Sequence, residues 1–249
     1  FVDGRYTIQV REQVSGQLYQ YCQVPQTSIA DWLGEHAPQG ARIGYDAWLH
    51  GKGWTAAAAR ALKDIGGELV AVDSNPIDAV WNDRPAPSDA PAIIHAHEYA
   101  GRSSQEKRAE IGEWLTAKKL DAAVISALDS LAWLFNIRGS DVERTPVALG
   151  FAIVHADGTA ALFMPEGKVP AEVRAHLGNA VSVHEREAFV TSLAELKDSR
   201  VAVDPERSVA AIFAALAEAG AEIVELRDPC VLAKAVKNPV EQVGHRAAQ

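Results

Sequence analysis

The chain has 249 residues, of which 48% are hydrophobic and 23% are charged, and its net charge is −9. This length and composition are typical of a soluble globular protein with one large or two ordinary domains, and the negative charge argues against nucleic acid as the main partner. No apolar stretch approaches the roughly 20 residues that span a bilayer, and two distant cysteines, Cys22 and Cys230, favour a reduced cytoplasmic setting over a disulfide scaffold.

The first third of the chain predicts a hairpin followed by alternating helices and strands. Strands at 1–2 and 6–10 would flank the turn Asp3-Gly4, where glycine supplies the positive φ of a tight turn. The pattern then predicts a helix, a strand, a helix and a strand over 27–33, 42–46, 55–65 and 69–72. Strands that alternate with helices are typical of an α/β fold.

Residues 82–103 have a different character. Pro85, Pro87 and Pro91 stand among aspartate and serine, without helical or strand periodicity. We interpret 1–84 as a first domain and 85–103 as a linker. A second domain over 104–237 would open with a helix to 119, capped by Ser103 or Ser104, and Glu106 can complete a capping box with Ser103.

The second domain continues the α/β alternation. A strand over 121–126 and a short helix over 129–135 are followed by a hairpin of strands 147–154 and 159–164 around Asp157-Gly158. Further helices and strands are predicted over 169–178, 187–196, 201–203, 208–219 and 222–226. Asn238-Pro239 is typical of a helix start, so 238–249 reads as the first helix of a further domain.

The sequence also repeats itself once. Residues 42–46 (RIGYD), an Ala-rich helix and 68–73 (ELVAVD) correspond to 200–204 (RVAVD), a second Ala-rich helix and 222–226 (EIVEL). Residues 1–4 correspond to the end of the strand at 160–163. A period above a hundred residues indicates a duplicated domain and not a repeat array. Since the second copy has a long segment before its strand, we expect the first domain to be truncated at its N-terminus.

The loop 136–141 (NIRGSD) is the best candidate for a functional site. It sets an amide, a guanidinium and a carboxylate, from Asn136, Arg138 and Asp141, around a glycine that allows a sharp turn. An arginine here could bind a carboxylate with two parallel hydrogen bonds. The alternative is an internal pair between Arg138 and Asp141 that only shapes the loop.

The one dense group of possible metal ligands is His95, His97 and Glu98. Two histidines at i and i+2 can chelate a metal from a strand, but a functional site needs three or four convergent ligands. No further ligand can be named, so solvated linker residues are the simpler interpretation and no metal site is predicted. P-loop, dinucleotide-binding, serine hydrolase and HExxH motifs are absent.

Several strings together resemble one family. FVDGRYT at 1–7, IGYD with WLH at 43–50, WNDRP at 81–85, WLFNIRGSD at 133–141 and KNPVE at 237–241 are similar to the large, three-domain Xaa-Pro aminopeptidases (aminopeptidase P) of the creatinase superfamily. The loop from Asn136 to Asp141 is the most specific part of this resemblance, which runs the length of the chain.

The resemblance implies two related creatinase/prolidase N-terminal-like domains, each a mixed sheet flanked by helices, that precede a catalytic domain. The family removes an N-terminal residue that precedes proline, with two divalent metals, typically manganese, that activate water. Those ligands, two Asp, one His and two Glu, belong to the catalytic domain, and the matching motifs are absent here. The chain alone is therefore expected to be inactive, with no catalytic residue and no metal of its own.

The implied role of the chain is to shape substrate access, with Asn136, Arg138 and Asp141 facing the cleft over the catalytic domain. The implied partners are that domain and peptides with proline in second position, in a cytoplasmic homodimeric parent. A standalone binding module of the same fold without peptidase activity is the alternative. A third interpretation, an unrelated enzyme that uses His95 and His97, predicts stoichiometric metal in this chain.

Overall fold

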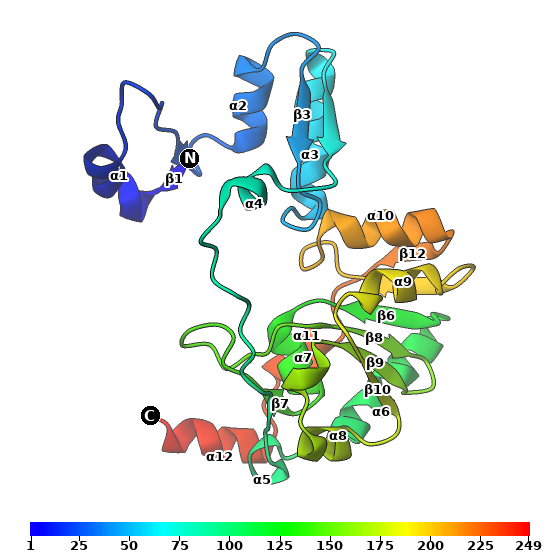
Figure 1. The fold of residues 1–249 in the computed structure, drawn as a ribbon. Coiled ribbons are helices and arrows are strands. Elements are labelled where there is room, and N and C mark those ends of the chain that lie inside the picture. Colours follow the sequence, from blue (N-terminus) through cyan, green and yellow to red (C-terminus); the bar gives the residue numbers. More distant parts are fainter. The chain divides into compact units, whose positions relative to one another are not determined.

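A computed structural model describes all residues from 1 to 249 and divides them into two compact units, residues 1–82 and 83–249. Each unit is a set of helices and strands (Figure 1). Each also has an apolar core of its own. None of the helices combines the length and the apolar character that crossing a bilayer requires.

The second unit is built on a mixed sheet of six strands in the order β10-β9-β8-β6-β11-β12. Strand β8 is antiparallel to both of its neighbours, and the other pairs are parallel. The α/β fold with a mixed sheet, expected from the sequence, is thereby confirmed. The strands are β6 (Ala122–Ile125), β8 (Phe151–His155), β9 (Ala160–Phe163), β10 (Val181–His184), β11 (Arg200–Val203) and β12 (Glu222–Glu225).

Helices cover both faces of this sheet (Figure 1). Strand β6 shows why, because Ala123 and Ile125 belong to one apolar cluster whereas Ala122 and Val124 belong to the other. Alternate residues of a strand point to opposite faces, so a fully apolar strand must be covered twice. The helices are α5 (His97–Ala100), α6 (Ser104–Ala117), α7 (Leu128–Leu134), α8 (Ala171–Leu177), α9 (Ala188–Ala194), α10 (Ala210–Ala219), α11 (Cys230–Ala235) and α12 (Pro239–Ala247), with a 3-10 turn, η2 (Glu166–Lys168).

The first unit holds two separate, two-stranded parallel sheets. Its core is small and consists of Leu33, Ala58 and Leu62 with partly buried neighbours. The elements are β1 (Val2–Asp3), η1 (Gly4–Tyr6), α1 (Thr7–Gln13), β2 (Gln23–Val24), α2 (Ile29–His36), β3 (Arg42–Tyr45), α3 (Lys52–Asp64), β4 (Glu68–Ala71) and α4 (Pro76–Val80).

The predicted hairpin around Asp3-Gly4 is wrong. The Asp3 carboxylate accepts a hydrogen bond from the backbone N–H of Arg5 at 2.9 Å and so caps a helical turn that continues into α1. An aspartate side chain that satisfies a nearby N–H favours a helix start over a strand. Strand β1 pairs in parallel with β2 instead of turning back on 6–10.

Two other segments differ from the sequence prediction. Residues 93–94, expected to be extended linker, form β5 (Ile93–Ile94) and pair with β7 (Ile137–Arg138). Strand β8 starts at Phe151 and not at 147, because the backbone N–H of Leu149 donates to the Asp141 carboxylate at 2.7 Å instead of joining a ladder. Local sequence patterns do not reveal either of these long-range bonds.

Candidate functional site

The loop 136–141 begins at a residue in the left-handed region. Asn136 has φ +50° and is 1% exposed, a conformation that asparagine tolerates better than most residues. Its amide nitrogen donates to the Arg102 carbonyl at 2.7 Å, and its amide oxygen accepts from the Lys107 ammonium at 2.7 Å. Asn136 is therefore a buried anchor of the loop, bonded to the protein through both its amide nitrogen and its amide oxygen.

Lys107 is a buried cation that the sequence analysis did not single out. It is 2% exposed, donates to the Trp133 carbonyl at 2.8 Å as well as to Asn136, and lies 4.4 Å from the centre of the Trp133 ring. Its segment of α6 is rich in charged residues and looks like a solvated helix face, so no local signal marks it. Lys107 ties α6 to the end of α7, directly behind the loop.

Arg138 lies on β7 and is half-buried. One guanidinium nitrogen donates to the carbonyls of Ala132 and Ile137 at 3.0 and 2.9 Å. These carbonyls fix the orientation of the side chain without neutralising its charge. Of the three predicted site residues, Arg138 is the one that lines a large groove.

Asp141 does not pair with Arg138. Its carboxylate forms an ion pair with Lys168 and accepts the Leu149 N–H at 2.7 Å, and both charged side chains are almost fully buried, with exposures of 0% and 4%. Burial alone would raise the pKa of Asp141, but the bonds from Lys168 and Leu149 outweigh it and lower that pKa. The structure therefore separates Asp141 from Arg138 and places it inside the loop's support.

A groove of about 930 Å³ lies between α12 and the rest of the second unit. We call it the α12 groove. Its walls combine apolar side chains with both signs of charge. It is lined by His95, Glu98, Tyr99, Asp129, Ala132, Trp133, Arg138, Thr145, Pro146, Val147, Lys234, Lys237, Val240, Glu241, Val243, Gly244, His245, Ala247 and Ala248.

Three basic side chains, His95 and Arg138 of this groove and the buried Lys107, lie close enough to influence one another. Burial lowers the pKa of His95 and of Arg138, and it lowers the pKa of Lys107 to about 8. Their mutual repulsion adds to this for His95 and Lys107. The Glu241 carboxylate acts in the opposite direction on all three. Glu241 is therefore the counter-charge of this cluster, and it is supplied by α12.

Helix α12 is attached to α5 through its first residues. Asn238 caps α12 at the predicted helix start, forms a capping box with Glu241 that the sequence analysis did not name, and donates from its side-chain nitrogen to the Ala100 carbonyl at 2.8 Å. The next residue, Gly101, has φ +68°, and a Cβ there would lie 2.6 Å from the Asn238 side-chain oxygen. This close approach requires glycine and holds one wall of the groove in place.

The possible metal ligands at 95–98 are not brought together. His95 and Glu98 line the α12 groove, whereas His97 lines a separate cavity of about 380 Å³ beside α6 and α8. No group of three or more His, Cys, Asp or Glu side chains anywhere in residues 1–249 is arranged to hold a metal ion. The residues present therefore do not fit a metal centre.

The fold and the groove define a class, an α/β domain with a mixed six-stranded sheet and a charged groove. The family model described as the Creatinase/Prolidase N-terminal domain matches residues 83–241. The chain belongs to this family.

Curated relatives match almost the whole chain. It is 38% identical over 260 residues to a "Probable Xaa-Pro aminopeptidase P" of Coccidioides posadasii, covering 98% of this chain and 42% of that protein. A protein of the same name from Arthroderma gypseum is 36% identical, with 98% and 40% covered. The chain thus spans about two fifths of the length of these relatives. The resemblance noted from the sequence strings is confirmed.

A solved structure matches along the same extent. The crystal structure of X-prolyl aminopeptidase from Caenorhabditis elegans, described as a cytosolic enzyme with a di-nuclear active site, superposes with a TM-score of 0.89 at 28% identity. The match covers 99% of this chain and 41% of that one. The similarity therefore extends over both units.

Proposed function

We propose that the chain is the non-catalytic N-terminal portion of a metal-dependent Xaa-Pro aminopeptidase, where it shapes the access of peptide substrates. The observation that supports this most directly is the 38% identity over 98% of the chain to a relative named Xaa-Pro aminopeptidase P. The likeness to the C. elegans enzyme adds support along the same residues.

The proposal assigns the metal chemistry to residues outside this chain. The C. elegans relative has a di-nuclear active site by its description, and no side-chain cluster here fits such a centre. In the proposed parent, two divalent metals, with manganese as our candidate, would supply the water activation. We also propose that this parent is a cytoplasmic homodimer.

In this chain, which we propose shapes substrate access, Arg138 is the candidate for contact with the peptide. It lies in the α12 groove, its charge is oriented by two carbonyls, and it has free donors for a peptide carbonyl or carboxylate. Asn136 and Asp141, each held by buried bonds, would keep the loop in position. We therefore propose that the three residues act together at the cleft, with Arg138 as the group that meets substrate.

The test uses the complete polypeptide, with its catalytic part, beside residues 1–249. Hydrolysis of a peptide with proline in second position should require the complete polypeptide and a divalent metal. Arg138→Ala in that polypeptide should raise KM or lower kcat about tenfold or more, the loss expected for a charged hydrogen bond, with an unchanged melting temperature.

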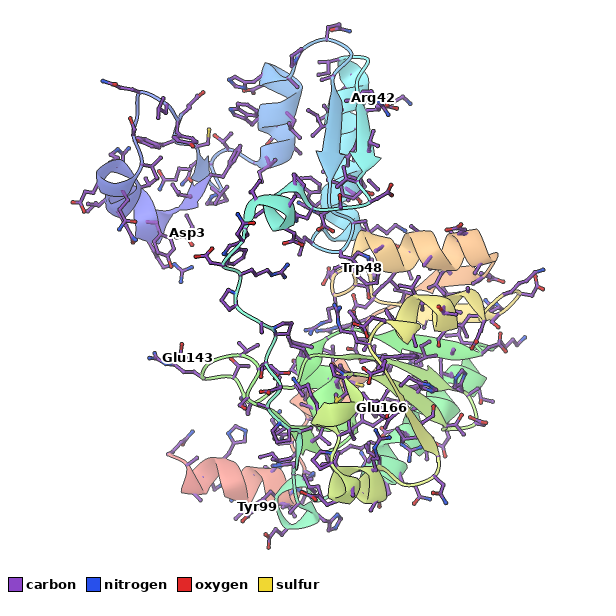
Figure 2. The ribbon with its side chains drawn as sticks, viewed as in Figure 1. Asp3, Arg42, Trp48, Tyr99, Glu143 and Glu166 are labelled. Carbon is purple, nitrogen blue, oxygen red and sulfur yellow. The ribbon has the colours of Figure 1, made fainter.

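Arg144→Ala is the matched control. Arg144 is next to Glu143 on the loop that projects from the sheet in Figure 2, and its side chain is 89% exposed. Its kinetics should equal those of the unaltered polypeptide. Lost stability with unchanged kinetics in Arg138→Ala would instead leave Arg138 with a purely structural role. A complete polypeptide without peptidase activity would favour the binding-module alternative.

A further inference from the structure

The cavity beside α6 and α8 is separate from the α12 groove and has a different lining. It lies where α5, the first turns of α6 and the end of α8 meet, and we call it the α6 cavity. Its volume of about 380 Å³ is within the range of small-molecule sites. It is lined by His97, Ser103, Ser104, Gln105, Arg108, Asn136, His176, Leu177, Gly178, Asn179 and Ala180.

The titratable side chains of this lining are all basic. They are Arg108, His97 and His176, and no aspartate or glutamate lines the cavity. Nε2 of His176 donates to the Phe135 carbonyl at 3.0 Å, which holds this ring in the cavity wall. The chain as a whole has a net charge of −9, so the α6 cavity differs in sign from the rest of the molecule. Such a lining favours an anion as the ligand.

Arg108 is a buried guanidinium without a carboxylate partner. It is 4% exposed, and its Nη1 donates to the Gly158 carbonyl. Burial lowers the pKa of Arg108, and no neighbouring carboxylate raises it. Its Nε is buried and has no hydrogen-bond partner. A buried donor of a charged group costs free energy when it is left unpaired, so its free position points to a ligand.

The unused edge of Arg108 suits an oxyanion. Because Nη1 bonds to Gly158, Nε and Nη2 are left without a protein acceptor. These two donors form one edge of the planar guanidinium, and that edge binds two oxygens of a single oxyanion through parallel hydrogen bonds. Gly158 therefore holds the side chain in place while the two-donor edge stays available.

Ser104 supplies a second buried polar group without a partner. It is 4% exposed, it lines the α6 cavity, and its Oγ has no hydrogen-bond partner. Ser104 and Arg108 are four residues apart on α6, so their side chains lie on the same face of the helix. The hydroxyl and the guanidinium therefore serve the same cavity.

The N-terminus of α6 adds backbone donors to the same wall. The Glu106 N–H donates to the Ser103 hydroxyl, and the Ser103 N–H donates to the Glu106 carboxylate, which does not line the cavity. The N–H groups of Ser104 and Gln105 open this 14-residue helix and have no intrahelical acceptor. Free N–H groups and the helix dipole together favour an anion at this position.

We propose that the α6 cavity binds a phosphate group, with Arg108, Ser104 and the first N–H groups of α6 as its donors. A phosphate presents three or four oxygens and up to two negative charges, so it can accept from all of these donors at once. A carboxylate has only two oxygens and would leave some of the donors unpaired. The volume of the cavity leaves room beside the phosphate for the organic part of a small monoester.

The experiment measures phosphate binding to residues 1–249 by NMR. Sodium phosphate is titrated at constant ionic strength, with sodium chloride as the balancing salt, and the Ser104 and Gln105 amides report on the site. Their resonances should shift along a saturable curve. Phenyl phosphate is titrated in parallel. Tighter binding of the ester would assign the cavity to an organic phosphate monoester, and tighter binding of inorganic phosphate would assign it to the free ion.

Ser104→Ala is the decisive variant. It should weaken phosphate binding about fivefold, the effect of one hydrogen bond. Its melting temperature in phosphate-free buffer should not fall, because the Ser104 hydroxyl has no protein partner to lose. Ser130→Ala is the matched control, since the Ser130 hydroxyl is also buried without a partner but does not line the α6 cavity. Its phosphate affinity should equal that of the unaltered chain.

A second variant tests the guanidinium edge. Arg108→Lys keeps the positive charge but removes the two-donor edge, and it should weaken phosphate binding about tenfold or more. Arg174→Lys, on the neighbouring helix α8, is its control, because Arg174 does not line the cavity. The affinity of Arg174→Lys for phosphate should be unchanged.

Three results would overturn the proposal. The Ser104 and Gln105 resonances could fail to shift, or could shift without saturation, which would show an adventitious ion only. Acetate, titrated in the same way, could bind as tightly as phosphate, which would make the cavity a carboxylate site. Ser104→Ala and Ser130→Ala could also bind phosphate equally well, which would place the ion elsewhere on the chain.

Discussion

Gly139 is the residue of the loop that has the least room for a side chain. A Cβ at this position would lie 2.8 Å from both the backbone nitrogen and the Cα of Ala148. Backbone atoms cannot move aside as the end of a flexible side chain can. We expect Gly139→Ala to destabilise the second unit by about 2 kcal/mol, the usual range for overpacking, measured by urea unfolding.

The matched control for this prediction is Gly167→Ala. Gly167 lies in a helical turn of the same unit, and a Cβ there would meet nothing within 4 Å. The free energy of unfolding of Gly167→Ala should stay within about 0.5 kcal/mol of that of the unaltered chain. Equal effects of the two substitutions would show that the loop adjusts and that the contact with Ala148 is not a constraint.

Lys107 gives the second unit a defined pH dependence. Burial lowers its pKa in the folded chain from 10.5 to about 8. Between these two values the unfolded chain binds more protons than the folded chain, so the contribution of Lys107 to stability rises with pH across that window. Below pH 8 both states are protonated, and the cost of burying the charge is fully present.

The measurement is the free energy of unfolding at pH 7.5 and at pH 10 for the chain and for Lys107→Met. The unaltered chain should gain stability relative to the variant as the pH rises, although the variant also loses the bonds to Trp133 and Asn136. The exposed Lys197→Met serves as the control and should show no such relative change. If the difference in unfolding free energy between the unaltered chain and Lys107→Met were the same at both pH values, the lowered pKa of a buried Lys107 would be contradicted.

At the level of elements, helix caps were the most predictable part of the fold. Ser103 with Glu106 forms the capping box that the sequence indicates, and α12 starts after Asn238, as Asn238-Pro239 indicates. Each motif is local, and all of its bonds lie within four residues. Asp3-Gly4 was misread because the same residues suit a turn or a helix start, and the choice depends on whether a partner strand is present.

The candidate site was only partly predictable for the same reason. The loop 136–141 could be selected from its residue types, but the roles inside it depend on groups that are distant in sequence. Lys107 holds Asn136, and Lys168 holds Asp141, across 29 and 27 residues. No spacing rule connects such positions, so the sequence alone could not tell that Arg138 is the member that lines the α12 groove.

The cap of α12 leads to a prediction at the scale of a single helix. Asn238→Ala removes the cap and the bond to the Ala100 carbonyl, and α12 has no buried residue to hold it otherwise. Loss of a cap costs about 1 to 2 kcal/mol. We expect the α12 amides to lose most of their protection from hydrogen exchange while those of β6 keep theirs.

Arg246→Ala, an exposed change on the same helix, is the control for this experiment. It should leave the exchange of α12 unchanged. If Asn238→Ala also left α12 protected, contacts other than the cap would have to hold the helix against α5, and the wall of the α12 groove would not depend on Asn238.

For the whole molecule, the important contrast is between the cores of the two units. Buried residues in the first unit are limited to Ala30, Leu33, Ala58 and Leu62, whereas the second unit has two large apolar clusters, one on each face of its sheet. Stability follows the apolar area removed from water. No apolar cluster includes residues of both units, so each core should respond to its own mutations.

We therefore expect two calorimetric transitions in residues 1–249, with the first unit unfolding at the lower temperature. Leu62 and Leu216 provide a matched pair, since both are 0% exposed and precede the equivalent ends of α3 and α10. Leu216→Ala should cost about 2 to 5 kcal/mol and lower only the upper transition. Leu62→Ala should reduce the temperature of the first unit's transition, or abolish that transition, and leave the upper transition unchanged. A single transition moved by both substitutions would mean that the two units unfold together, and the small core of the first unit would then depend on the second.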